Sequence, residues 1–194
     1  IKAQNVKVIQ ENTLDVGDKT AQKLIEQHAI KSLPALVVTG EVSKASLAQI
    51  WSSLGGAQHH GAVVIQGVPP YYDLTAKKVV GIVDVIYLAD NSCPECYDVY
   101  EHQAILQNFG IQPENSLQRD ASSDEGKALI KKYGISKVPT ILLSPAASVY
   151  PGLAQVWPQV GTKEADGWHV FRSVELMGTY KNLSSGKIVN ASTS

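Results

Sequence analysis

The sequence is poor in cysteine: its 194 residues include only two, Cys93 and Cys96, three positions apart. A small secreted domain held together by disulfides would carry more cysteines, spread out so as to close long loops. A zinc ribbon would need a second pair of ligands, and the sequence offers only His59 and His60 at a distance. No metal site is therefore expected, and the pair is either a redox couple or an incidental local disulfide.

The sequence also lacks an excess of charge of either sign and has no long apolar run. Seventeen basic and eighteen acidic residues give a net charge of −1, which argues against a nucleic-acid-binding surface. The longest apolar runs, such as residues 79–88, fall short of the ~20 residues that a membrane helix needs. With 44% hydrophobic residues, the composition predicts a soluble globular protein with a substantial core.

The chain has no visible signal peptide and begins at Ile1 rather than at methionine. We therefore expect a fragment of a longer protein, from which a signal or a membrane anchor has been removed. An extracytoplasmic or membrane-anchored location suits these features, and a cytoplasmic location suits them almost as well.

An internal repeat spans most of the chain. The segment AQKLIEQHAIKSLPALVVTG matches GKALIKKYGISKVPTILLSP, which places Pro34 opposite Pro139. Further along, LAQIWSSLGG matches LAQVWPQVGT, which places Trp51 opposite Trp157 and predicts that both tryptophans pack in a core. Finally, YYDLTAKKVVG matches YKNLSSGKIVN. The preserved order of these matches indicates a duplication.

The duplication predicts two domains, residues 1–82 and 83–194. The second opens with DVIYLADNSCPEC and a helical stretch, for which the first has no counterpart. The first unit should therefore lack its opening strand and helix, and the loss should leave a gap in its sheet.

Periodicity and turn residues predict the elements of each repeat. In the first, we expect strands at 6–9, 35–38 and 62–66, helices at 19–28 and 44–54, and a final hairpin. In the second, we expect strands at 84–89, 116–119, 140–143 and 169–173, a hairpin over 176–189, and helices at 92–110, 123–133 and 153–157.

The sequence Cys-Pro-Glu-Cys directly follows a predicted strand, a context in which this spacing indicates a redox site. If a helix begins here, with Ser92 as its cap, the helix dipole should lower the pKa of Cys93 and favour the attacking thiolate. Cys96, one turn later and directed toward the core, would resolve the mixed disulfide. Pro94 suits the first helical turn, while the charge of Glu95 should oppose thiolate formation.

Two neighbouring side chains are candidate partners of the cysteines. His102 lies about half a helical turn round from Cys93 at ~100° per residue, so we expect it to be solvated or packed rather than a general base. Tyr97 is one turn above Cys93 on the same face and is the expected neighbour.

The motif YLADNSCPECYDVY, followed by YGISKVPTILL, resembles the active-site half of the thioredoxin superfamily over about 110 residues. The resemblance implies that the Val138–Pro139 peptide is cis, lies beside the dithiol and offers backbone groups to an extended substrate. By inheritance, Leu33–Pro34 should share this geometry. The family has a buried acid six positions before the first cysteine, where this sequence has Tyr87.

The Cys-Pro-x-Cys form resembles glutaredoxins and periplasmic disulfide oxidases. The tandem layout resembles protein disulfide oxidoreductases and protein disulfide isomerases, which combine catalytic and non-catalytic units.

We therefore expect an α/β protein of tandem thioredoxin-like folds, each with a central mixed sheet flanked by helices, the first incomplete. The expected function is that of a thiol–disulfide oxidoreductase, with Cys93 and Cys96 catalytic and Val138 and Pro139 binding substrate. Its partners would be protein thiols or disulfides and a redox partner protein, with no cofactor. The alternative is a thioredoxin-like binding or scaffold module with a structural Cys93–Cys96 disulfide.

Overall fold

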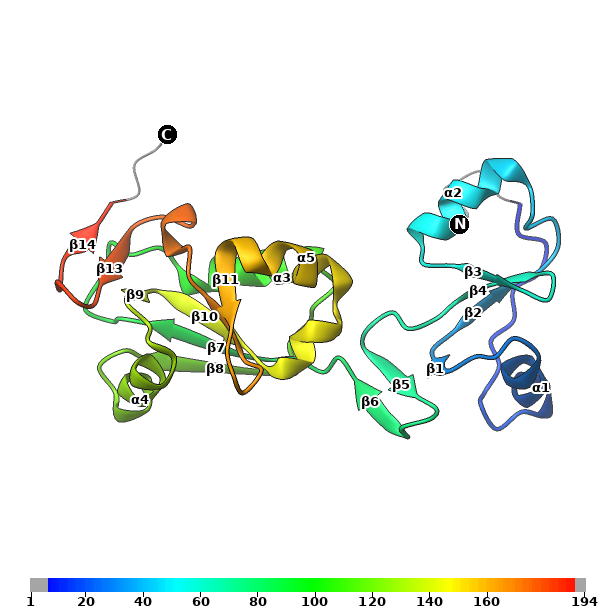
Figure 1. Ribbon diagram of the computed structural model, residues 1–194, viewed down its shortest axis with the longest axis horizontal. Helices are drawn as coiled ribbons and strands as arrows, with labels where there is room; N and C mark the ends of the chain where they lie inside the picture. The colour runs from blue at the N-terminus through cyan, green and yellow to red at the C-terminus, as the bar shows by residue number, and fades with distance from the viewer. Residues whose placement is uncertain (1–6, 191–194) are drawn as a thin grey trace. The chain divides into compact units, whose positions relative to one another are not determined.

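The computed structural model describes residues 7–190, and the chain divides into two compact units, residues 1–78 and 79–194. The predicted boundary lies after residue 82. The architecture is mixed α/β, with several sheets and five α-helices in the described part (Figure 1). No helix among residues 7–190 is long and apolar enough to cross a membrane.

The second unit is built on a five-stranded sheet with the strand order β11-β12-β10-β7-β8 (Figure 1). Strands β7 and β8 are parallel, and the other neighbours are antiparallel. The strands are β7 Asp84–Ala89, β8 Asn115–Asp120, β10 Thr140–Leu143, β11 Gly161–Lys163 and β12 His169–Phe171. Four of them confirm the predicted strands to within two residues at each end, and β11 was not predicted.

Side chains of the central strands alternate between two cores, one on each face of this sheet. Val85, Tyr87 and Ile141 belong to one core, and Leu88 and Leu142 belong to the other. Each of these five residues is at most 1% exposed. Because both faces are buried, β7 and β10 are nearly continuous apolar runs in the sequence.

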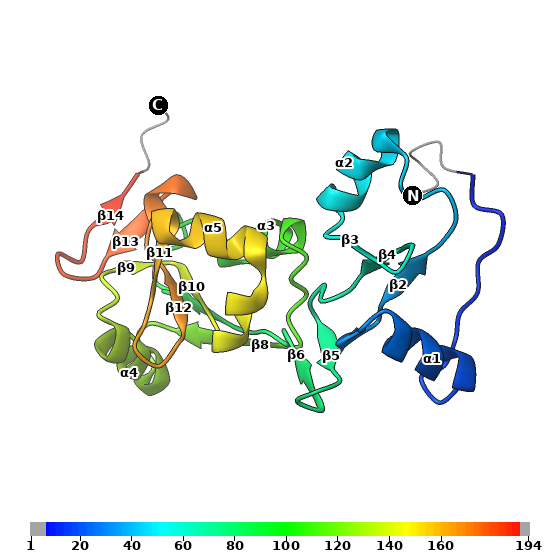
Figure 2. The same cartoon turned by 45° about the vertical axis from the view of Figure 1, so that its right-hand side comes forward.

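Helices cover both faces of the sheet. The helices α3 (His102–Asn108) and α5 (Pro151–Val160) lie together on one face, and α4 (Asp124–Tyr133) lies on the other (Figure 2). Leu106 of α3 and Trp157 of α5 bury their side chains in the core that contains Val85, Tyr87 and Ile141. The sheet is therefore the middle layer of three.

The ends of α4 follow from its capping residues. The Ser123 hydroxyl accepts a hydrogen bond from the Gly126 N–H at 3.0 Å, and Gly134 ends the helix in the left-handed conformation. This helix is confirmed as predicted. In contrast, α5 is longer than the predicted helix, because Pro151 lies in its first turn, where no N–H donor is needed, and Pro158 is tolerated within its last turn.

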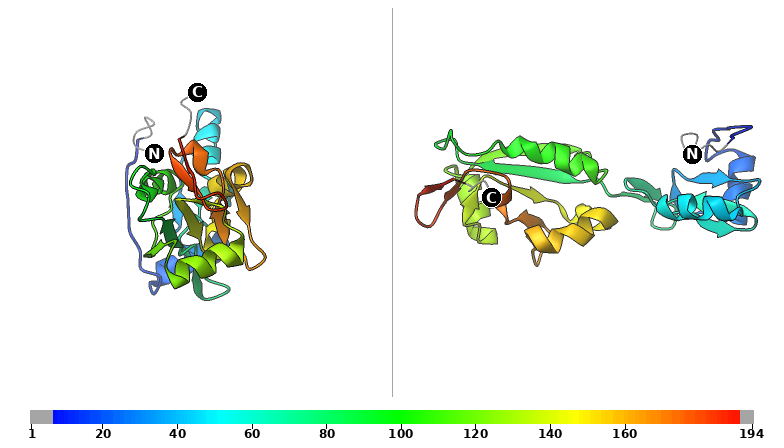
Figure 3. Two further views of the ribbon diagram at one scale, coloured as in Figure 1. Left: turned by 90° about the vertical axis from the view of Figure 1, so that its left-hand side faces the viewer. Right: turned by 90° about the horizontal axis from the view of Figure 1, so that it is seen from above.

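A smaller sheet forms the C-terminal end of the second unit, with the strand order β14-β13-β9. It consists of β9 Lys137–Val138, β13 Tyr180–Asn182 and β14 Ile188–Val189. The last two form the predicted hairpin, visible at the end of the unit in Figure 3. Through β9, this sheet leads directly into β10 of the main sheet.

The first unit contains two three-stranded sheets, with the orders β2-β4-β3 and β1-β5-β6. Its elements are α1 Lys19–Gln27, β1 Ser32–Leu33, β2 Leu36–Val38, α2 Ala45–Ser53, β3 Ala57–His59, β4 Ala62–Ile65, β5 Tyr71–Asp73 and β6 Lys78–Val80, which crosses the unit boundary. Both predicted helices and the two later strands are present.

The two units share a strand arrangement that follows the sequence repeat. The order β2-β4-β3 corresponds to β10-β12-β11, and β1-β5-β6 corresponds to β9-β13-β14. In the described part of the first unit, β2 has a strand neighbour on one side only, since nothing there corresponds to β7. β2 is therefore an edge strand of a continuous three-stranded sheet, and the loss of an opening strand from this unit stays a prediction.

The repeated tryptophans pack as predicted. Trp51 is 3% exposed and Trp157 is 6% exposed. Each indole N–H donates to a backbone carbonyl, that of Val42 at 2.9 Å and that of Thr162 at 3.1 Å. Both side chains thus satisfy their one polar group while burying a large apolar surface.

The strand predicted at 6–9 is wrong for residues 7–9, and residue 6 lies outside the described residues. Residues 7–9 pair with no strand of the described chain, and Ile9 is 92% exposed. An apolar pattern alone does not form a strand without a neighbour to complete its hydrogen bonds.

Candidate functional site

Cys93 and Cys96 form a disulfide, with their Cα atoms 5.4 Å apart. They lie in a tight turn that follows the end of β7, which we call the cysteine turn (residues 90–98). The Cys93 N–H donates to the Asp90 carbonyl at 3.0 Å, and the Cys96 N–H donates to the Cys93 carbonyl at 3.2 Å. The main chain of the turn is thus held by local hydrogen bonds.

The prediction that a helix begins at the cysteines is wrong. A 3₁₀ turn, Val99–Glu101, precedes α3, which begins only at His102. The Asp98 carboxylate caps this turn by accepting from the Tyr100 N–H at 2.9 Å. Ser92, the predicted cap, instead donates its hydroxyl to the Asp90 carboxylate.

A tertiary hydrogen bond and the backbone conformation of Asp98 explain why the helix starts late. The Tyr97 N–H donates to the Thr179 carbonyl at 2.8 Å and is therefore not available to a helical carbonyl. Asp98 has an extended backbone, as an N-cap residue usually does. The expected effect of a helix dipole on the pKa of Cys93 consequently has no structural basis, because no helix begins there.

The burial of the two cysteines is also the reverse of the prediction. Cys93 is only 6% exposed, whereas Cys96, expected to be directed toward the core, is partly exposed. Pro94 and Glu95 between them are exposed. Pro94, Glu95 and part of Cys96 are therefore accessible to solvent.

Pro139 lies at the same end of the sheet as the cysteine turn. Strand β10 begins at Thr140, which pairs with Leu88 near the end of β7, so the residue before Thr140 lies where β7 passes into the turn. The Tyr97 hydroxyl donates to the Pro139 carbonyl at 2.8 Å and ties the two segments together.

The Val138–Pro139 and Leu33–Pro34 peptides are cis, as the family resemblance implies, and Pro69–Pro70 is a third cis peptide that was not predicted. The side chain of Val138 is fully buried. Pro139 is buried as well, so substrate binding at Val138 and Pro139 stays a prediction.

An ion pair that was not predicted flanks the cysteine turn. The Lys181 ammonium donates to the Asp90 carboxylate at 2.7 Å and to the Ser92 hydroxyl at 3.0 Å. Lys181 reaches the turn from β13, where it pairs with Val138. Burial raises the pKa of Asp90, but the hydrogen bonds from Lys181 and Ser92 outweigh this effect and hold the pKa below the usual carboxyl value.

The sequence contained a signal for this lysine. In the repeat, Lys181 lies opposite Tyr72, so the cation occurs only in the copy that carries the cysteines. A residue that is found only in the copy with the disulfide, and not in the other copy, is a candidate for a role at that disulfide.

Tyr97 connects the cysteine turn to a buried histidine. Its hydroxyl lies 3.1 Å from His102 Nε2, and its single proton is given to the Pro139 carbonyl. His102 must then donate from Nε2, since the phenol oxygen can only accept this second bond. Burial raises the pKa of the Tyr97 phenol, and the charge of Glu101 adds to this effect, so the hydroxyl stays protonated.

His102 is packed rather than solvated, which confirms the first of these outcomes; both had been predicted as alternatives. It is 2% exposed, and its ring meets that of Phe171 edge-on at 4.7 Å. Burial lowers the pKa of His102 to about 4. The ring is therefore neutral near pH 7 and acts here as a hydrogen-bond donor.

Stability should accordingly fall in mild acid. Between pH 6.5 and about 4 the unfolded chain binds a proton at His102 and the folded chain does not, which removes about 3 kcal/mol of the free energy of unfolding. His169, whose pKa burial also lowers, adds a contribution of the same sign. Urea unfolding of the full chain, followed at several pH values, measures this loss.

The control for this prediction is a pair of histidine variants. His102→Phe should flatten the pH dependence over this range, whereas His60→Gln, at an exposed position, should leave it unchanged. An equally steep pH dependence in His102→Phe and in the wild-type chain would contradict the assignment.

Among residues 7–190, no group of three or more histidine, cysteine, aspartate or glutamate side chains is arranged to hold a metal ion. No family model, characterised protein or solved structure matches the chain. Its chemistry must therefore be argued from the geometry of the cysteine turn itself.

Proposed function

We propose that the chain is a thiol–disulfide oxidoreductase that exchanges disulfides with protein substrates through Cys93 and Cys96. The observation that carries the proposal is the disulfide itself, which closes a turn at the end of a buried strand and leaves part of Cys96 exposed. The Pro139 segment lies at the same end of the sheet.

The short span of the disulfide supports a redox role over a structural one. A disulfide stabilises mainly by closing a loop in the unfolded chain, and the effect grows with loop length. This one joins residues only three positions apart. It holds together no distant elements, and the cysteine turn is already held by hydrogen bonds that Asp90 accepts from the Cys93 N–H and from Lys181.

The proposed exchange proceeds in two balanced steps. A substrate thiolate attacks one sulfur of the Cys93–Cys96 bond, forms a mixed disulfide and releases the other sulfur as a thiolate. A second substrate thiolate then attacks the substrate sulfur of the mixed disulfide, which leaves the substrate oxidised and both protein cysteines reduced. The reverse sequence reduces a substrate disulfide. The assignment of the first attack on such a substrate to Cys93 stays a prediction.

We further propose that the second unit is thioredoxin-like and that the first is its incomplete, non-catalytic copy. The five-stranded mixed sheet with helices on both faces supports the first part. The matching strand orders and the missing counterpart of β7 support the second. In this view an extended substrate segment binds beside the Val138–Pro139 peptide, which requires these two residues, buried in the oxidised chain, to become accessible.

Reduction of insulin by the full chain, with dithiothreitol as electron donor, tests the proposed function. Catalysed precipitation of the insulin B chain is the expected result. If the chain is reduced but insulin is lost no faster than with dithiothreitol alone, the alternative of a binding or scaffold module with a structural disulfide stands.

A further inference from the structure

Residues 179–183, which we call the β13 segment, link the cysteine turn to β9 (Figure 1). The Thr179 carbonyl accepts a hydrogen bond from the Tyr97 N–H of the turn at 2.8 Å. Two residues further along, Lys181 lies opposite Val138 of β9 in an antiparallel pair. The segment is therefore an extended chain that contacts both the turn with the disulfide and the strand that leads to Pro139.

The main-chain groups of Val138 are among those that bind the β13 segment. The Leu183 N–H donates to the Ser136 carbonyl at 2.8 Å, so these two residues form a hydrogen-bonded pair. Hydrogen-bonded and non-hydrogen-bonded pairs alternate along an antiparallel ladder, so Val138 and Lys181 form the next hydrogen-bonded pair. The N–H and the carbonyl of Val138 are thus directed at the β13 segment.

Under the proposed function, an extended substrate segment binds beside the Val138–Pro139 peptide. A segment that adds to a strand is held mainly by main-chain hydrogen bonds, and its side chains provide specificity. The β13 segment already pairs with Val138, and both Val138 and Pro139 are buried in the oxidised chain. A substrate segment must therefore displace the β13 segment and replace its contacts.

The side chain of Lys181 indicates what such a substrate needs. Its ammonium donates to the Asp90 carboxylate at 2.7 Å and to the Ser92 hydroxyl at 3.0 Å. The Asp90 side chain is only 11% exposed, so it is costly to leave without a partner once the β13 segment is displaced. A lysine or arginine of the substrate that takes the position of Lys181, opposite Val138, restores the ion pair.

The first unit shows which of these features belong to the repeated fold. There β5 pairs with β1, and Tyr72 lies opposite Leu33. Tyr72 corresponds to Lys181 in the repeat. The strand pairing is therefore common to both units, while a cation at this position occurs only in the unit that carries the cysteines. This difference supports a role of the position in exchange rather than in folding alone.

We propose that the β13 segment occupies the place of the substrate, and that the preferred substrates are extended protein segments with a lysine or arginine that pairs with Asp90. The inference rests on the proposed function, since it concerns the substrates of the same disulfide. Displacement of the β13 segment then limits exchange with protein segments, whereas a small disulfide that forms no strand needs no displacement.

The first test is the rate at which the reduced full chain reacts with short peptides that contain one cysteine, carried as a mixed disulfide with 2-nitro-5-thiobenzoate. One lysine is moved through the positions on either side of the cysteine, and each peptide is matched by one with methionine there. We expect a lysine peptide to react about tenfold faster than its match, the effect of a hydrogen bond between charged groups. Asp90→Asn should abolish this ratio, which is taken within each variant and so does not depend on overall stability.

The second test loosens the β13 segment without changing the cysteine turn. The Asn182 side chain accepts hydrogen bonds from the Ser184 and Ser185 N–H groups, at 3.0 and 3.1 Å, in the turn between β13 and β14. Asn182→Ala should raise the rate with the peptides about fivefold, the effect of one hydrogen bond on the displacement equilibrium. The rate with the small disulfide hydroxyethyl disulfide should stay unchanged.

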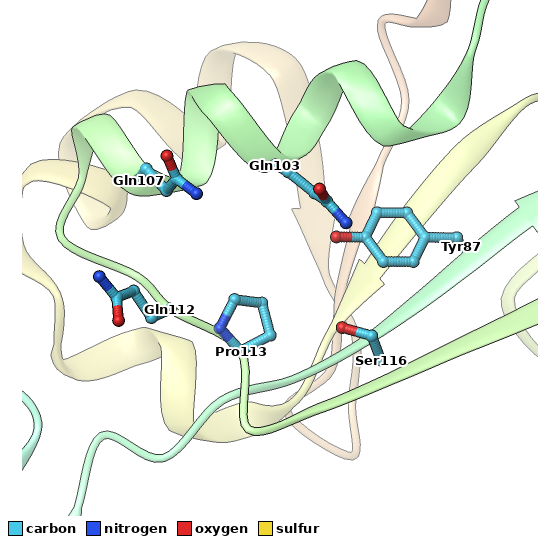
Figure 4. A pocket seen from close by; sticks show the side chains of 6 residues that line it. All are labelled: Tyr87, Gln103, Gln107, Gln112, Pro113 and Ser116. Atoms are coloured by element: carbon cyan, nitrogen blue, oxygen red, sulfur yellow. The ribbon is translucent and has the colours of Figure 1, made fainter.

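Two control variants should leave both rates unchanged. Asp73→Ala removes the matching side chain of the first unit, which accepts from the Thr75 and Ala76 N–H groups at 2.8 Å in a hairpin of the unit without cysteines. Gln107→Ala changes a polar pocket of the second unit that includes no residue of the cysteine turn or of the β13 segment (Figure 4). This pocket is lined by Tyr87, Gln103, Gln107, Gln112, Pro113 and Ser116.

Hydrogen exchange gives a readout that needs no change in the β13 segment. In the single-cysteine variant that accumulates a mixed disulfide with the best peptide, the backbone amides of residues 180–182 should exchange faster than in the same variant without peptide. The proposal is overturned if these amides keep their protection, if no lysine peptide reacts faster than its methionine match, or if Asn182→Ala does not accelerate the peptides selectively.

The small disulfide separates this inference from the proposed function. If the reduced chain exchanges with neither the peptides nor hydroxyethyl disulfide, both the proposed function and the inference fail. If it exchanges with both, at rates that lysine and Asn182→Ala do not change, the proposed function stands and this inference alone is wrong.

Discussion

Replacing either Cys93 or Cys96 with serine is expected to reduce insulin reduction to the rate of dithiothreitol alone. Exchange needs both sulfurs, one to form the mixed disulfide and one to resolve it, and the chain has no third cysteine to substitute. The turbidity assay measures this loss, with Ser92→Ala as the matched control in the same turn. That variant keeps both sulfurs and should retain turnover.

The same variants show which cysteine contacts the substrate. The sequence prediction assigns the first attack to Cys93, so Cys96→Ser should accumulate a mixed disulfide that non-reducing electrophoresis detects. Accumulation on Cys93→Ser instead would reverse the roles, in line with the greater exposure of Cys96 in the oxidised chain. If a single-cysteine variant kept full turnover, the exchange mechanism itself would be wrong.

Removing the charge of Lys181 should affect both folding and redox behaviour. Lys181→Met leaves the Asp90 carboxylate, whose side chain is 11% exposed, without its ion-pair partner. We expect a loss of about 1–3 kcal/mol in the free energy of unfolding, the usual cost of an unpaired buried polar group. Urea unfolding of the oxidised chain measures it.

The lysine should also favour the reduced state, because a cation beside the cysteine turn stabilises a thiolate. Its removal should therefore make the reduction potential more negative, by up to about 30 mV, which is a tenfold change in the equilibrium constant. Equilibration in glutathione buffers measures this shift in Lys181→Met against the wild type.

Lys137→Met is the matched control. It breaks the ion pair with Glu175, whose two side chains are 30% and 45% exposed, on the strand that pairs with β13. This more exposed pair should cost less than about 1 kcal/mol and leave the potential unchanged. A shift of the potential in both variants would assign the effect to the sheet rather than to Lys181.

Adding Asp90→Asn to Lys181→Met should restore part of the lost stability, since no carboxylate then remains unpaired.

Most of the regular elements could be predicted from the sequence because their signals are local. Strands β7 and β10 are apolar runs buried on both faces, and α4 carries its own cap at Ser123 and its own terminator at Gly134. The duplication could be recognised because Trp51 and Trp157 are kept at matching positions, where each packs in a core and donates its indole N–H to a backbone carbonyl.

The cysteine turn could not be predicted in this way, because distant residues shape it. The helix starts late since the Tyr97 N–H bonds to Thr179, which is 82 residues further along the chain (179 − 97). Lys181 reaches Asp90 across a similar separation. No local pattern near Cys93 encodes either contact, and a tertiary hydrogen bond here overrides the helical preference that the local sequence suggested.

The reduction potential of the Cys93–Cys96 couple in the full chain tests the central claim most directly. The protein is equilibrated in glutathione buffers of graded composition, and the free thiols are alkylated and counted by mass. The redox proposal predicts reversible reduction of the folded protein, at a potential between about −270 mV and about −120 mV. A potential below about −300 mV, or a disulfide that is reduced only when the chain unfolds, would contradict it and mark the bond as structural.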